Sequence, residues 1–300
     1  MQSSLFTTVF LPLALAIIML GLGLSLTKDD FKRVLVYPRA VFVGLLCQML
    51  LLPAVAFGLA KALELPPELA VGLMLLAASP GGATANLFSH LAHGDVALNI
   101  TLTAVNSVLS LLTLPLIIQF SLEAFLGGGK TIPLQLDKVL QVFAIVLVPV
   151  ALGMVVHARA PKVAARLNSP VRIMSAVLLL VVVLATVLKE RAHLVEYLQL
   201  VGLPVLAFNL ASLAVGYLVP LLARLPEKQA VAIGMEIGIH NGTLAIAIAS
   251  SPLLLNNSTM AVPPAIYSLI MFFTAAAFGA VVSRRLKTAQ AGFSAAAEIN

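Results

Sequence analysis

Long runs of apolar residues, separated by short polar connectors, fill the chain from end to end. A helix that crosses roughly 30 Å of hydrocarbon needs about 20 consecutive, mostly apolar residues. The pattern predicts about nine such helices, and no connector is long enough to hold a soluble domain. Their expected ranges are 5–26, 38–60, 68–92, 96–122, 137–158, 170–188, 198–223, 229–251 and 261–283. We therefore expect an all-α polytopic membrane protein that forms one integral unit over residues 1–300.

The composition agrees with this prediction, since 61% of the 300 residues are hydrophobic and only 10% are charged. A soluble domain of this length would need a polar surface that so few charges do not supply. The net charge of +6 comes from basic residues in the connectors, without the aromatic interleaving of a nucleic-acid interface. With the C-terminus inside, thirteen of the eighteen Lys and Arg residues are cytoplasmic. The positive-inside rule then predicts an N-out, C-in protein of the plasma (inner) membrane, with residues 288–300 as a cytoplasmic tail.

Two of the predicted spans, 68–92 and 229–251, carry helix-breaking residues near their middle. The first contains the run SPGGATAN, and the second contains GMEIGIHNGT. Pro and Gly interrupt helices, and backbone groups released at membrane depth must face protein or a water-filled cavity. Two interrupted spans at corresponding places are typical of inverted-repeat transporters, whose binding site lies between the breaks. The alternative is that the glycines only permit close helix packing.

One acidic residue, Glu236, lies inside a predicted span, whereas the other eleven lie in connectors, near span ends or in the tail. A charge at the bilayer centre costs at least about 2.5–3.5 kcal/mol on insertion scales, so its usual role is functional. The alternative is a protonated carboxyl group that hydrogen-bonds a neighbouring helix. A carboxylate suits either a proton or a metal cation, so its neighbours must distinguish the two.

The uncharged side chains with oxygen atoms in the predicted spans 38–60, 68–92 and 96–122 include Gln48, Asn86, Asn99, Thr103 and Asn106. The last three recur at i, i+4 and i+7, which places them on one helical face. Neutral oxygens with one carboxylate match a monovalent ion, whereas Mg²⁺ or Zn²⁺ would call for more carboxylates or for His and Cys ligands. For Asn106, the furthest along this face, we favour a hydrogen bond between helices.

Each break also turns the N-terminus of a second half-helix toward the middle of the membrane. Free N–H groups and the positive end of the helix dipole attract an anion such as a carboxylate there. The residues placed to line this position are Thr84, Asn241, Gly242 and Thr243. The residues therefore predict a monovalent cation beside an organic anion, where two broken helices cross.

Three segments, GLGLSLTKDDF, SPGGATANLFSHLAHGDVALNITLTAV and EIGIHNGTLAIAIA, resemble the bile acid:sodium symporter family, and the chain is similar to bacterial members over nearly its whole length. The resemblance implies a core domain with two crossing helices and a panel domain that rocks against it. The panel would comprise 1–30 and 136–190, and the core 36–123 and 195–287. Relative to ten-helix members, the chain lacks the first helix, which agrees with a count of nine.

The resemblance also implies that organic anion uptake is coupled to two sodium ions. Carried over by position, the first sodium site would use Asn86, Asn99, Thr103 and Glu236. The second would use Gln48, Glu236, His240 and the backbone carbonyls of Ile237 and Ile239. The substrate would meet the residues after the first break and those of the second, which are Gly82, Ala83, Thr84, Asn241, Gly242 and Thr243.

Three positions depart from the family pattern. Ala85 stands where a serine is frequent, which removes one oxygen, and Asn99 replaces a usual serine, which restores one. His240 replaces a glutamine, and a neutral imidazole is a poor sodium ligand that accepts a proton near neutral pH. One or two sodium ions are therefore expected, with a proton as the alternative at the second site. Another interpretation is that His240 only bonds a carbonyl released by the break.

These features predict a monomeric secondary active symporter that imports an organic anion, bile-acid-like or a small carboxylate, with Na⁺. Its other partners would be membrane lipids, and not nucleic acid. The alternative is a proton-coupled organic anion transporter or antiporter that uses Glu236 and His240. An enzyme is not expected, because one intramembrane acid offers no carboxylate pair and no Ser/His or metal-ligand cluster accompanies it.

Overall fold

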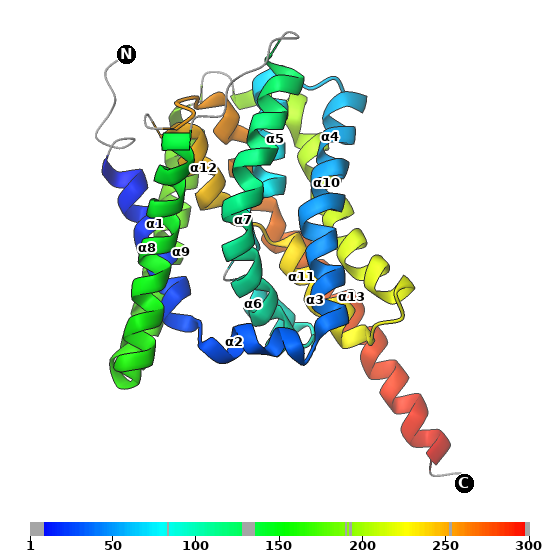
Figure 1. Cartoon of the computed structure of the whole chain (residues 1–300). Coiled ribbons are helices and arrows are strands. Elements are labelled where there is room, and N and C mark those ends of the chain that lie inside the picture. The colour runs from blue at the N-terminus through cyan, green and yellow to red at the C-terminus, as the bar shows by residue number, and fades with distance from the viewer. Residues whose placement is uncertain are drawn as a thin grey trace.

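The computed structural model describes residues 9–82, 84–127, 136–189, 191, 194–251 and 254–297, and it is helical throughout (Figure 1). The α-helices are α1 (Leu11–Ser25), α2 (Lys28–Lys32), α3 (Pro38–Leu46), α4 (Leu52–Ala62), α5 (Pro67–Ala78), α6 (Ala85–Leu91), α7 (Val96–Phe125), α8 (Leu136–Arg159), α9 (Pro161–Lys189), α10 (Leu194–Leu222), α11 (Glu227–Gly238), α12 (Gly242–Ser250) and α13 (Val262–Ala297). The predicted all-α class is confirmed. Of the predicted tail, residues 288–297 continue α13, and 298–300 lie outside the described residues.

Within the described residues, four helices are long and apolar enough to cross a membrane, and two bent pairs raise the number to six. The predicted ranges 68–92 and 229–251 do not qualify as single helices, because each is divided. Their parts, α5 with α6 and α11 with α12, have 12, 7, 12 and 9 residues. Each part is too short to cross a bilayer as one helix. The count of nine spans and the N-out, C-in orientation stay predictions.

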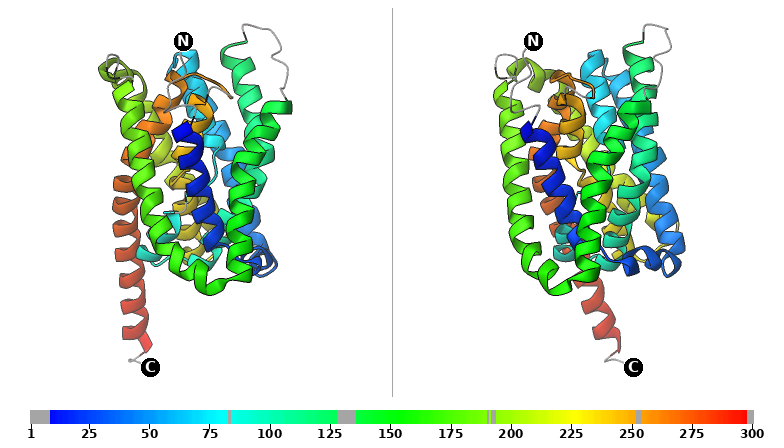
Figure 2. Two further views of the ribbon diagram at one scale, coloured as in Figure 1. Left: turned by 90° about the vertical axis from the view of Figure 1, so that its left-hand side faces the viewer. Right: turned by 60° about the vertical axis from the view of Figure 1, so that its left-hand side comes forward.

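Three helices, α1, α8 and α9, form a layer on one side of the molecule (Figures 1 and 2). Their backbones approach closely through glycines, since a methyl group on Gly153 would lie 2.6 Å from the Leu20 carbonyl oxygen. Small residues permit this approach where lipid supplies no hydrophobic driving force between helices. The remaining helices lie behind the layer, and α13 finishes at the end of the molecule opposite to the start of α1 (Figure 1).

The short helix α2 connects α1 of the layer to α3, and it runs across the lower end of the molecule in Figure 1. Here the chain turns by 73° between Leu11–Ser25 and Lys28–Leu35. Thr27 and Asp30 form a capping box in which each side chain bonds the backbone N–H of the other residue. The buried Asp30 carboxylate also pairs with Arg33. The joint between the layer and the other helices is therefore held by local polar contacts.

A second bend of 56° divides α7 between Val96–Ser110 and Leu112–Phe125. Pro115 lies inside this helix and lacks the N–H group that would bond the carbonyl four residues earlier, at position 111. The half before the bend carries Asn99, Thr103 and Asn106. The bend therefore leaves the predicted polar face on one straight segment.

Candidate functional site

The two helix breaks lie against each other and exchange hydrogen bonds. The N–H of Gly82 donates to the Ile239 carbonyl at 2.6 Å, and the N–H of Asn241 donates to the Pro80 carbonyl at 2.9 Å. Gly81 and His240 form an antiparallel bridge between them. Each break thus satisfies backbone groups that the other releases, as buried polar groups require. The predicted meeting of two broken helices is present in the structure.

Glu236 lies in the last turn of α11, beside this crossing, and its side chain is completely buried. The Thr103 hydroxyl donates to its Oε2 at 2.6 Å, and the Asn106 amide donates to its Oε1 at 3.2 Å. A methyl group on Gly81 would collide with the carboxylate, so glycine is needed where α5 ends. Neither ion pair found among the described residues involves Glu236. Its carboxylate therefore lies in the interior with neutral donors and no basic partner.

The predicted polar face of α7 points at this carboxylate. Asn99, Thr103 and Asn106 are all fully buried, and Asn99 Nδ2 donates at 2.7 Å to the carbonyl of Ala232, one turn before Glu236. The hydrogen bond between helices that the sequence favours for Asn106 is present, and its partner on α11 is the Glu236 carboxylate. This contact follows from the i+7 spacing, so it was within reach of the sequence pattern.

Three buried amide oxygens on α6 and α7, two helices that pack against α11, accept no hydrogen bond from the described residues: Oδ1 of Asn86, Asn99 and Asn106. Each is an amide oxygen, and an unpaired buried acceptor is costly unless a donor or a cation satisfies it. No group of three or more His, Cys, Asp or Glu side chains in the described part of the chain is placed to hold a metal ion. Neutral oxygens beside one carboxylate fit a monovalent cation.

Gln48 reaches the crossing from a π-helical turn, Cys47–Leu51. The Leu52 N–H bonds the Cys47 carbonyl, five residues earlier, where a regular α-helix would use the carbonyl four residues earlier. The next residue, Pro53, has no N–H to donate. The Gln48 amide donates to the carbonyls of Ala77 and Ser79 at 3.2 and 2.9 Å. Its Oε1 has no partner among the described residues.

His240 lies at the same carbonyl, because its Nδ1 is 3.1 Å from the Ser79 oxygen. Its ring stacks on Phe208 and meets Tyr267 edge-on, with centroids 5.7 and 5.3 Å apart. Nδ1 donates here, since a carbonyl only accepts, so Nε2 is a bare acceptor and has no partner in the described structure. The structure thus places Gln48 and His240 at the same carbonyl, and the contact of Nδ1 with Ser79 matches the interpretation in which His240 bonds a carbonyl at the break.

The backbone carbonyls of Ile237, Gly238 and Ile239, at the second break, have different hydrogen-bond partners. The Ile239 carbonyl accepts the Gly82 N–H, and the N–H that would bond the Ile237 carbonyl in a continuous helix, that of Asn241, bonds Pro80. The pattern of apolar residues did not identify Asn209 and Tyr267, which donate to the Gly238 carbonyl at 3.2 and 2.9 Å. Both come from other helices, so no spacing in the sequence indicates them.

Most residues predicted to meet the anion surround the start of the two second half-helices. Asn241 caps α12 by accepting the Leu244 N–H at 3.0 Å, and Thr243 is buried behind it. A side chain at Gly242 would collide with Ser268. Thr84 precedes α6 and is half-buried. Ala83 lies outside the described residues.

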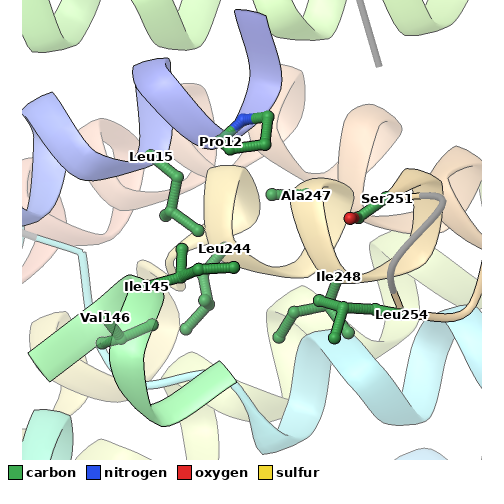
Figure 3. Close-up of a pocket in the computed structure, with 9 residues that line it drawn as sticks. All are labelled: Pro12, Leu15, Ile145, Val146, Leu244, Ala247, Ile248, Ser251 and Leu254. Atoms are coloured by element: carbon green, nitrogen blue, oxygen red, sulfur yellow. The ribbon is translucent and has the colours of Figure 1, made fainter. Parts of the chain in front are cut away.

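An apolar cleft opens between α12 and two helices of the layer (Figure 3). It starts at Leu244, three residues after Asn241, and ends near Ser251, the one polar side chain of the set. Its lining comprises Pro12 and Leu15 of α1, Ile145 and Val146 of α8, Leu244, Ala247, Ile248 and Ser251 from the second half-helix and its end, and Leu254. The cleft therefore lies between the layer and α12, the half-helix that begins at the crossing of the two breaks.

Comparison with known proteins agrees with this geometry. The pattern of the Sodium Bile acid symporter family matches residues 12–197. An uncharacterized sodium-dependent transporter of Bacillus subtilis, YocS, is 31% identical over 96% of this chain and 88% of its own length. The probable sodium/metabolite cotransporter BASS2 of rice chloroplasts is 28% identical over 90% of this chain and 62% of its own.

A mammalian relative lies at similar distance. The rabbit ileal sodium/bile acid cotransporter is 27% identical over 89% of this chain and 77% of its own length. Together with the apolar helices, these similarities indicate an integral, multi-pass membrane protein. The family match covers more than half of the chain, including the first break and the polar face of α7. The chain belongs to the sodium bile acid symporter family, a family of sodium-coupled transporters.

Proposed function

We propose that this protein is a secondary active symporter that imports an organic anion, bile-acid-like or a small carboxylate, together with Na⁺ across the plasma (inner) membrane. The observation that carries the proposal is the fully buried Glu236 carboxylate, which has no basic partner in the described structure. It accepts hydrogen bonds from α7, a helix that also carries the unpaired amide oxygens of Asn99 and Asn106. A buried charge without a counter-ion is strongly destabilising. A bound Na⁺ would supply that counter-ion.

The first ion is assigned to Glu236, Asn86, Asn99 and Thr103, where the unpaired amide oxygens support it. A second ion would lie near Gln48 and His240, with the Ile237 and Ile239 carbonyls. The unpaired Gln48 Oε1 supports that site. His240 Nδ1 is engaged by the Ser79 carbonyl, so His240 can offer the ion only its Nε2 atom. An imidazole nitrogen is a poorer ligand for sodium than an oxygen, which weakens the second sodium site.

The organic anion would bind where the second half-helices begin, at Gly82, Ala83, Thr84, Asn241, Gly242 and Thr243. The N-terminus of α12 supplies N–H groups and the positive end of its dipole. The apolar cleft that starts at Leu244 is narrow in this structure and would have to open to take the hydrocarbon part of such an anion. Bound Na⁺ would neutralise Glu236, so that an anion can bind beside it without repulsion.

Alternating access would arise from the panel, residues 1–30 and 136–190, which moves against the core, residues 36–123 and 195–287. The three-helix layer of α1, α8 and α9 supports the panel assignment, and this layer contacts α12, at whose start the anion would bind. Ligands shift such an equilibrium only by binding one state more tightly. One chain holds all the proposed ligands, so the monomer would suffice.

Replacement of Glu236 by Gln tests the assignment. The change preserves shape but removes the only charge of the site, so the affinity for Na⁺ should fall by about a hundredfold or more, at about 1.4 kcal/mol per tenfold. The measurement is Na⁺-driven anion uptake in proteoliposomes, with thermal unfolding as a check that the variant folds. Undiminished uptake by the folded variant would refute the role of Glu236.

Proton coupling is the second candidate, because His240 presents an unpaired buried nitrogen four residues after Glu236. Uptake with a Na⁺ gradient and no pH gradient, followed by the reverse, distinguishes the two candidates. The proposal expects uptake in the first condition. Uptake in the second alone would favour the proton.

A further inference from the structure

Asn106 occupies a position at the carboxylate that the sodium assignment above does not use. It lies on α7, three residues beyond Thr103, and is completely buried. Its Nδ2 donates to Glu236 Oε1 at 3.2 Å, while the Thr103 hydroxyl donates to Oε2 at 2.6 Å. One helix therefore holds both oxygens of the carboxylate, one through each residue.

The chemistry of the carboxylate determines which way the Asn106 amide faces. An ionised carboxylate only accepts hydrogen bonds, so the atom opposite Oε1 must be the amide nitrogen. The amide oxygen then points elsewhere in the interior, and it has no partner among the described residues. An amide whose nitrogen is bonded to the carboxylate thus presents a bare, buried oxygen.

We propose that Asn106 is a positioning and selectivity-determining residue of the cation site. Its N–H fixes the orientation of Glu236, and its Oδ1 adds a third amide oxygen to those of Asn86 and Asn99. This inference rests on the proposed sodium coupling. With Asn106 included, the proposed ligands of the first ion are three amide oxygens, the Thr103 hydroxyl and the Glu236 carboxylate.

Such a set distinguishes a metal cation from a proton. A proton would need one acceptor, whereas a hard cation needs several oxygens arranged around it. The set carries a single negative charge, which suits a monovalent ion. Because the amide is locked by the carboxylate, the spacing of its oxygen is fixed, and ions of different radius should be bound unequally.

The test uses Asn106→Leu, which keeps the number and branching of the side-chain heavy atoms but removes both the donor and the oxygen. The matched control is Ser107→Ala on the same helix, since the Ser107 hydroxyl bonds the Thr103 carbonyl within α7. Among the described residues, the donors to the Glu236 carboxylate are Thr103 and Asn106 instead. The readouts are the Na⁺ and Li⁺ concentrations that give half-maximal thermal stabilisation of the purified protein and half-maximal anion uptake.

We expect Asn106→Leu to raise the half-maximal Na⁺ concentration about tenfold and to change the Li⁺ to Na⁺ ratio, while Ser107→Ala stays within about twofold of the wild type. A purely structural role would lower the unfolding temperature without Na⁺ and leave the half-maximal concentrations unchanged. That result would overturn the inference. If Asn106→Leu fails to fold, Asn106→Ser replaces it, because a hydroxyl can still donate to Oε1.

The serine variant should show an intermediate rise in the half-maximal Na⁺ concentration, and an unchanged value in the folded variant would also overturn the inference. The response of the wild type to Na⁺ shows whether a negative result concerns only Asn106 or the proposed sodium coupling. A wild type stabilised by Na⁺, with Asn106 variants that behave identically, refutes only the role of Asn106. A wild type without any Na⁺ response refutes the sodium coupling itself.

Discussion

The Glu236 carboxylate is surrounded by donors that carry no charge. Thr103 and Asn106 contribute one hydrogen bond each, and the nearby amide oxygens are acceptors that repel the carboxylate unless something positive lies between them. Neutral hydrogen bonds repay only part of the cost of burying an ion. Under the proposed function, a bound cation or proton would complete this arrangement and would link ion binding to conformation.

Part of this site follows from the sequence. Glu236 stands out as the intramembrane acid, and the i, i+4, i+7 spacing predicts the face of Asn99, Thr103 and Asn106. The contact of Gly81 with the carboxylate and the use of the Ser79 carbonyl by Gln48 and His240 could not be predicted. They depend on how closely α5 approaches α11 and α4, and a single sequence carries no signal for that distance.

Gly81→Ala tests the close approach at the residue scale. The added methyl group would collide with the Glu236 carboxylate, so we expect the Na⁺ concentration for half-maximal uptake to rise at least about tenfold. The matched control is Gly58→Ala in α4, where an added methyl group meets nothing within 4 Å. That variant should unfold at the same or a slightly higher temperature, because alanine favours a helix by about 0.5–1 kcal/mol. Equal Na⁺ dependence of both variants would contradict the close approach.

At the scale of elements, the breaks in the third and eighth predicted spans serve two purposes. The glycines of α11 do allow close packing, since a methyl group on Gly216 of α10 would lie 2.7 Å from the Gly234 Cα atom. The break itself falls later, at residues 239–241, where backbone groups bond the other break. Close packing and the break therefore involve different residues of one span, and a binding site between the breaks stays a prediction.

The element ends were less predictable. We expected a span over 170–188, but α9 begins at Pro161, because a helix can extend past the apolar segment with charged residues such as Lys162 and Arg166. α13 likewise continues to Ala297, beyond the expected end at 283. Apolar runs predict the part of a helix that lies in lipid, whereas helix ends depend on local capping.

The joint at α2 gives a prediction at this scale. Asp30→Ala removes one side of the capping box and the ion pair with Arg33, so the protein should lose about 1–2 kcal/mol of stability. Asp29→Ala is the control, because its pair with Lys32 is exposed and surface pairs contribute about 0–1 kcal/mol. Thermal unfolding in detergent compares the two. Equal losses would show that the capping box does not hold the joint.

The whole molecule divides between the layer of α1, α8 and α9 and the helices that carry the crossing. The cleft lies along this division, with Leu15 and Val146 from the layer and Ala247 from α12 (Figure 3). An apolar cleft between two bodies can open and close without breaking hydrogen bonds, unlike the crossing, where the breaks bond each other. Movement should therefore occur at the cleft, with the crossing as a rigid unit.

A cross-link across the cleft tests this movement. In Leu15→Cys/Ala247→Cys, a short reducible thiol cross-linker would join α1 to α12. Cys47, the one native cysteine, is first replaced by Ala in every variant, so that only the introduced thiols react. Na⁺-driven uptake in proteoliposomes should fall to the level seen without a Na⁺ gradient and return after reduction. The control, Leu15→Cys/Val146→Cys, joins two helices within the layer and should keep its uptake when cross-linked. If the α1–α12 link leaves uptake intact, the layer does not move against α12, whereas loss in both pairs would locate the movement within the layer itself.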